Sequence, residues 1–73
     1  MSSDVRKLFA KKLKAIRNER GLSQEELALL CGVDRTYIGR IERLERNPSL
    51  EVLQKIADGI GISLLDLLDF DNI

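Results

Sequence analysis

Apolar residues recur along this chain at the spacing of amphipathic helices, in five separate segments. The first segment places five apolar residues on one face: Val5, Leu8, Phe9, Leu13 and Ile16. The fourth should bury another such set: Leu50, Leu53, Ile56, Ala57 and Ile60. No stretch of six positions alternates apolar and polar residues, so strands have no support. The pattern predicts one all-α domain over residues 1–73, with five helices at about 4–20, 24–31, 35–44, 50–59 and 64–69.

Capping residues mark the boundaries of the second and third helices. In the sequence SQEE, Ser23 is expected to be the N-cap, with Glu26 returning a hydrogen bond from the third helical position. Gly32 follows the second helix, where a residue free to adopt positive φ suits a helix end. Asp34 then stands where a short polar side chain can cap the third helix. Capping chemistry therefore predicts where each of these two helices begins.

The second and third helices are separated only by a short turn, which is the arrangement of a helix-turn-helix unit. Counted from Gln24, the residue types that this unit needs stand at positions 5, 9, 10, 15 and 18: Ala28, Gly32, Val33, Ile38 and Ile41. The small alanine lets the helices approach and the glycine makes the turn. The three branched residues fix the second helix against the domain.

The stretch GLSQEELALLCGVDRTYIGRIERLERNPSLEVLQKIADGIGISLLDLL resembles the helix-turn-helix family of the phage repressors and Cro. The likeness covers about residues 8–68. Within that family, DRTYI, IER and RNPSL are similar to the controller proteins of restriction–modification systems, which are small dimeric transcription regulators. The resemblance implies a sequence-specific regulator that binds a palindromic double-stranded DNA operator as a homodimer. Two other interpretations stay open, an antitoxin or phage-type repressor and a protein-interaction module that touches no DNA.

The N-terminal end of the third helix is expected to enter the major groove. Because Ile38 and Ile41 fix its inner face, Arg35, Thr36 and Arg40 should point outward and read bases. Arginine can pair with two acceptors of guanine, and threonine can hydrogen-bond a base or touch the thymine methyl group. The alternative for all three residues is an ordinary solvated helix face.

Residues around this helix are expected to hold DNA phosphates. They are Ser23, Gln24, Tyr37, Arg43, Arg46 and Asn47. Ser23 and Gln24 stand at a helix N-terminus, where free N–H groups and the helix dipole favour an anion. The resemblance implies backbone contacts by Gln24, Tyr37, Arg46 and Asn47. For Arg43 an ordinary surface charge is the competing interpretation, and for Tyr37 it is packing at the edge of the core.

Other residues near this unit are interpreted as structural. The resemblance assigns Arg17 and Glu42 to an ion pair that links the first helix to the third. Cys31 is expected to be a small buried residue rather than a redox switch. Gly39 departs from the polar residue that many relatives carry there, and it either allows a close backbone approach or is simply tolerated.

Composition excludes several classes of function. The chain has 73 residues, no histidine and one cysteine, which leaves no intrachain disulfide, no Cys/His metal site and no histidine-based catalytic pair. No enzyme activity, cofactor or metal is therefore expected. No apolar run is long enough to cross a membrane, and the first residues lack the apolar core of a signal peptide. The expected location is cytoplasmic, in association with the nucleoid.

Charge is distributed unevenly although the net charge is zero. Residues 1–20 carry seven basic and two acidic side chains, whereas residues 47–73 carry one basic and five acidic ones. Such asymmetry can orient a protein on a polyanion and keep its acidic end away. Contact with RNA polymerase is left open by the sequence.

The C-terminal segment holds more apolar residues than one face of a short helix can bury. They are Leu64, Leu65, Leu67, Leu68, Phe70 and Ile73. Part of this surface is expected to form a homodimer interface, since a two-fold pair would present two recognition helices one DNA turn apart. The alternative is that all six residues close the core of a single chain.

Overall fold

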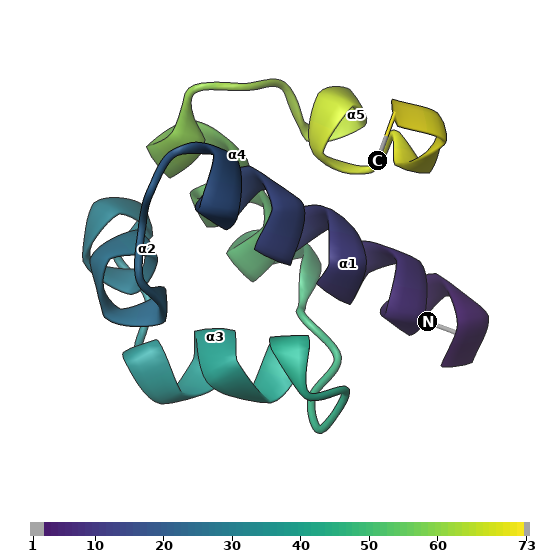
Figure 1. The fold of residues 1–73 in the computed structure, drawn as a ribbon, viewed down its shortest axis with the longest axis horizontal. Helices are drawn as coiled ribbons and strands as arrows, with labels where there is room; N and C mark the ends of the chain where they lie inside the picture. The colour runs from purple at the N-terminus through teal and green to yellow at the C-terminus, as the bar shows by residue number, and fades with distance from the viewer. Residues whose placement is uncertain (1–2, 73) are drawn as a thin grey trace.

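The computed structural model describes residues 3–72 and is all-helical over that range, as the sequence predicts (Figure 1). Its elements are α1 (Ser3–Glu19), α2 (Gln24–Cys31), α3 (Arg35–Glu42), α4 (Leu50–Ile60), α5 (Leu64–Leu67) and a final 3-10 turn, η1 (Phe70–Asn72). The long helix α1 runs across the middle of the molecule (Figure 1). Helix α3 lies on one side of it, while α5 and η1 lie on the other. Helix α3 and the C-terminal tail, formed by α5 and η1, are therefore on separate faces.

All five α-helices contribute to one apolar core. Its largest fully buried side chains are Phe9, Leu13, Leu27, Ile38, Ile56 and Leu67. Burial of each of these side chains stabilises the fold by roughly 1.5–3 kcal/mol. The expectation that Leu50 is buried was wrong, because at the first position of α4 its side chain points outward and is 75% exposed.

Helix α3 ends at Glu42, two residues before the predicted end. Leu44 adopts a φ of +64°, which reverses the chain after the helix. The N–H groups of Leu44 and Glu45 then donate to the carbonyls of Ile41 and Arg40, at 3.1 and 2.8 Å. This is the hydrogen-bond pattern of a Schellman motif, with leucine where glycine is usual. The predicted helix was too long because Leu44 continues the apolar spacing of α3.

Candidate nucleic-acid interface

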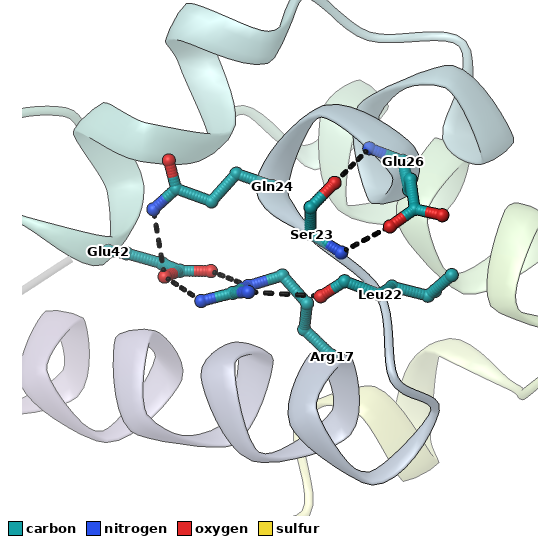
Figure 2. Close-up of polar contacts among 6 residues, drawn as sticks. All are labelled: Arg17, Leu22, Ser23, Gln24, Glu26 and Glu42. Atoms are coloured by element: carbon teal, nitrogen blue, oxygen red, sulfur yellow. Dashed lines mark hydrogen bonds and ion pairs between the residues drawn. The ribbon is translucent and has the colours of Figure 1, made fainter.

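The turn between α2 and α3 has the geometry that its capping residues predict. The Ser23 hydroxyl accepts the Glu26 N–H at 3.0 Å, and the Glu26 carboxylate accepts the Ser23 N–H at 2.9 Å (Figure 2). The same backbone N–H lowers the pKa of Glu26. At the other end of α2, Gly32 has a φ of +70°, a left-handed conformation that glycine adopts without strain. The angle between the two helices is thus set by local interactions.

Asp34 caps the N-terminus of α3. Its carboxylate accepts the Thr36 N–H at 2.7 Å, and this hydrogen bond lowers the pKa of Asp34. The charged carboxylate also lies at the positive end of the α3 dipole. The recognition helix is therefore fixed at the end that would approach DNA.

The outer face of α3 is exposed and carries the three residues predicted to read bases. Arg35, Thr36 and Arg40 are all exposed, whereas Ile38 and Ile41 on the inner face are buried. Arg35 lies 3.5 Å from Glu25, with 70% and 62% of the two side chains exposed. An ion pair this exposed contributes little stability, so the guanidinium group remains available to a ligand.

Arg17 and Glu42 form the ion pair that joins α1 to α3 (Figure 2). Two parallel hydrogen bonds of 2.9 and 3.0 Å connect the guanidinium group to the carboxylate, and a third links Arg17 to the carbonyl of Leu22. The hydrogen bond that Arg17 donates to the Glu42 carboxylate raises the pKa of Arg17. Only 14% and 6% of the two side chains are exposed. The pair therefore joins α3 to α1 and is largely shielded from solvent.

Gln24 is tied to this ion pair, which the sequence did not predict. Its amide nitrogen donates to Glu42 at 3.1 Å, and its amide oxygen points away from the pair (Figure 2). One N–H of the amide is thus committed within the protein. A phosphate contact by Gln24 has to use the second amide hydrogen or the backbone N–H at the start of α2.

Tyr37 fastens the segment that follows α3. Its hydroxyl donates to the carbonyl of Asn47 and accepts the N–H of Ser49, both at 3.3 Å. The guanidinium group of Arg46 lies over the tyrosine ring, 5.2 Å from its centre. Tyr37 also packs against the core, as the second interpretation made from the sequence expects, while its phosphate contact stays a prediction. It holds Arg46 and Asn47 next to the recognition helix.

Two shallow hollows flank the exposed ridge of α3. One, of about 360 Å³, lies between α2 and α3 and is lined by Gln24, Glu25, Arg35, Thr36, Gly39 and Arg43. The other, of about 240 Å³, is lined by Asp34, Thr36, Tyr37, Arg40 and Arg46. Four arginines from α3 and its C-terminal end thus line two adjoining hollows, which makes this surface suited to a polyanion.

Three basic residues of α1, together with Arg20 just after it, donate to carbonyl groups of the protein itself. Arg20 donates to Ile60 at 2.8 Å, at the C-terminus of α4 where a cation is favourable. Lys12 donates to Asp69 at 2.9 Å and fastens the tail. Three lysines of α1 remain exposed: Lys7, Lys11 and Lys14. Non-specific attraction of DNA by α1 would depend on these lysines.

The apolar residues of the tail are divided between core and surface. Leu67 is fully buried within the chain and has no exposed surface to offer a second copy. Leu64, Leu68 and Phe70 are partly buried against the core. Leu65 is 82% exposed, and Ile73 lies outside the described residues. Of the six predicted interface residues, Leu65 is the most exposed among those described.

Other kinds of site have little support in the described part of the chain. Among residues 3–72 no group of side chains is arranged to hold a metal ion, and no helix is long and apolar enough to cross a membrane. Cys31 is buried, its thiol lies 3.7 Å from the carbonyl of Ile56, and burial raises its pKa. A raised pKa disfavours the reactive thiolate, which supports a packing role for Cys31.

A capped helix, a glycine turn and a second helix with an exposed cationic face define the class of helix-turn-helix DNA-binding regulators. Residues 13–67 match the helix-turn-helix family, and the chain belongs to that family. The resemblance inferred from the sequence is thereby confirmed.

Known proteins similar to this chain include controllers of restriction–modification systems. The control protein C.BamHI of Bacillus amyloliquefaciens is 45% identical to it, over all of this chain and 91% of the relative. The crystal structure of the restriction–modification controller protein C.AhdI from Aeromonas hydrophila superposes with a TM-score of 0.81, at 41% identity over 90% of this chain and 98% of the other. The controller protein C.Esp1396I, solved as a tetramer with its natural 35 base-pair operator, has a TM-score of 0.81 at 36% identity over 92% of each chain.

Proposed function

We propose that this chain is a transcription regulator that binds a palindromic double-stranded DNA operator as a homodimer, as a controller of a restriction–modification system. The observation that carries the proposal is the exposed row of Arg35, Thr36 and Arg40 on a helix whose opposite face is buried. Side chains of this kind match the donor and acceptor pattern of base edges in the major groove. Arg35 and Arg40 would each donate hydrogen bonds to the two acceptors of a guanine, and Thr36 would contact a neighbouring base.

Phosphate contacts in this proposal come from both ends of the recognition unit. Ser23 and Gln24 offer the N-terminus of α2, and Arg43, Arg46, Asn47 and Tyr37 surround the end of α3. Such contacts fix the position of the protein on the duplex without reading sequence. The carboxylate of Glu26, which is also at the α2 N-terminus, would oppose an anion there, so Gln24 is the stronger candidate of the first two.

A homodimer is proposed because one recognition helix reads only half of a palindrome. The tail is the proposed interface, through Leu65 and the exposed parts of Leu64, Leu68 and Phe70. It lies on the side of α1 away from α3 (Figure 1), so pairing of two tails would leave both recognition helices free. The operator complex of C.Esp1396I as a tetramer supports oligomeric binding for this chain as well.

The same proposal covers the remaining properties of the protein. It acts by binding and without catalysis, in the cytoplasm and in association with the nucleoid. Both directions of regulation fit the site, because a dimer over a promoter blocks RNA polymerase, whereas one bound beside a promoter can contact it. The regulated genes are those whose promoters carry the operator.

The test is selection of bound duplexes from a random DNA pool, with Arg35→Ala as the matched variant. The wild-type chain is expected to recover a palindrome whose half-sites are about one helical turn apart, and Arg35→Ala is expected to lose it. Circular dichroism would verify that the variant retains its helices, since Arg35 is exposed. Recovery of no motif would favour a protein-interaction module instead, whereas a motif that Arg35→Ala recovers equally would overturn the assignment of Arg35 to a base.

A further inference from the structure

Gly39 lies on the recognition helix, next to the predicted DNA contacts. Neighbouring side chains occupy the space that a side chain at position 39 would need. A Cβ atom added to Gly39 would lie 2.9 Å from Nη1 of Arg43 and 3.2 Å from Oε1 of Gln24. Both atoms are far ends of flexible side chains. A side chain at position 39 would therefore displace them without disturbing the backbone.

Arg43 occupies the space that Gly39 leaves free. Long side chains on a helix point back toward its N-terminus, so a residue at position 43 covers the turn that contains residue 39. Nη2 of Arg43 contacts Glu45 at 3.3 Å while Nη1 lies over Gly39. The guanidinium group is thus directed into the hollow of about 360 Å³ between α2 and α3.

We propose that Gly39 is a positioning residue, whose missing side chain allows the Arg43 guanidinium group to bind a DNA phosphodiester in this hollow. The hollow is lined by two guanidinium groups, from Arg35 and Arg43, and one carboxylate, from Glu25. The contact of Arg43 with Glu45 is an exposed ion pair that contributes little, so a phosphate oxygen can replace it. Arg43 is about half exposed, which leaves its outer donors free for a phosphate oxygen. This inference rests on the proposed DNA-binding function and adds to it a role for a glycine.

The alternative role for Gly39 is purely structural, and it predicts a different response. Glycine inside a helix is less favourable than alanine, so Gly39→Ala should not lower the melting temperature and is expected to raise it. A loss of DNA binding in a variant that is at least as stable would therefore report on the side chains displaced from position 39 rather than on the fold. Gly59 differs in this respect, because a Cβ there would lie 2.7 Å from the backbone of Cys31.

The experiment compares Gly39→Ala, Arg43→Ala and the double variant, with Lys55→Ala as the control for loss of one exposed charge on α4. The probes are the duplex that the wild-type chain selects and a scrambled duplex of equal length, titrated over a range of KCl concentrations. Both single variants are expected to weaken binding of both duplexes, by about tenfold. In both single variants the plot of log affinity against log salt should become less steep, by about one for each subunit. The slope for Lys55→Ala should equal that of the wild-type chain.

The double variant tests whether Gly39 acts through Arg43. It is expected to bind no more weakly than Arg43→Ala alone, because the two changes remove the same contact. Additive losses, an unchanged salt slope in Gly39→Ala, or an altered base preference at constant slope would each overturn the assignment.

Failure of this inference can be told apart from failure of the proposed function. If the wild-type chain selects a motif that Arg35→Ala loses, while Gly39→Ala binds like the wild type, only the role of Gly39 is wrong. If the wild-type chain selects no motif, both proposals are wrong.

Discussion

Leu44 illustrates a conformational cost carried by a single residue. Among residues 3–72 it is the one non-glycine residue with positive φ. A side chain in the left-handed region costs roughly 1–2 kcal/mol through contact of its Cβ with the backbone. Leu44 is half-buried and lies outside the set of residues packed on the core, so little apolar burial offsets this cost.

Replacing Leu44 by glycine is therefore expected to stabilise the protein. A glycine at this position would adopt the observed φ without strain, and the free energy of unfolding should rise by about 1 kcal/mol. Urea denaturation would show a higher midpoint at an unchanged m-value. Leu44→Ala is the control, since it removes the side chain beyond Cβ but keeps the conformational cost of a Cβ atom at positive φ. A lower midpoint for Leu44→Gly would mean that the leucine side chain contributes more packing than its exposure suggests.

Residue spacing alone could not reveal this feature. Leu44 follows Ile38 and Ile41 at helical intervals, so an apolar pattern extends the helix through it. The observed end depends on the backbone hydrogen bonds of residues 44 and 45 and on Arg6, which donates to the Leu44 carbonyl at 3.5 Å from 38 residues away. Contacts of such sequence separation leave no periodic signal.

At the scale of helices, starts were better predicted than ends. Ser23 and Asp34 cap α2 and α3 through hydrogen bonds to residues two or three positions ahead, so their chemistry is readable in a short stretch of sequence. The helix α2 was predicted with its observed bounds, Gln24–Cys31. The helix α5 is shorter than predicted because the chain turns at Leu68 and continues into η1.

The cap of α3 makes the stability of the protein depend on pH in a defined direction. The Thr36 N–H lowers the pKa of Asp34 in the folded state below its unfolded value of about 3.9. A lowered folded-state pKa contributes stability above the unfolded value, and this contribution is lost as pH falls through the folded value. Asparagine caps a helix comparably well but carries no charge.

The difference in melting temperature between the wild-type chain and Asp34→Asn is thus expected to be positive near pH 7. It should shrink as the pH is lowered from about 4 toward the folded-state pKa of Asp34. Thermal melts monitored by circular dichroism between pH 3 and pH 7 would measure it. Glu26 is present in both proteins, so its own titration cancels in the difference. A difference that is constant or grows at low pH would contradict a charged cap.

For the whole molecule, the sequence predicted the arrangement of helices but only part of the site. The inner face of α3 is apolar, which determines that Arg35, Thr36 and Arg40 lie outside. The hydrogen bond between Gln24 and Glu42 and the anchoring of the tail by Lys12 join residues 18 and 57 positions apart. These contacts follow from tertiary packing, and the spacing of residues along the chain does not indicate them.

The tail was ambiguous in the sequence for the same reason. A run of apolar residues does not indicate which of them pack into the core of their own chain. In the structure Leu67 belongs to the core and Leu65 is 82% exposed. The dimer proposed above therefore depends mainly on Leu65, which stands at the second position of α5.

Replacement of Leu65 by aspartate is expected to weaken the proposed homodimer. An acidic residue is compatible with the first turn of α5, so the chain should keep its helices. A charge at the centre of an apolar interface should raise the dimer dissociation constant by about tenfold or more. Sedimentation equilibrium would measure the change, with Leu50→Asp as the matched control, because Leu50 is 75% exposed in the first turn of α4. If Leu65→Asp dimerises like the wild-type chain, or if Leu50→Asp weakens the dimer to the same degree, the interface lies elsewhere on the molecule.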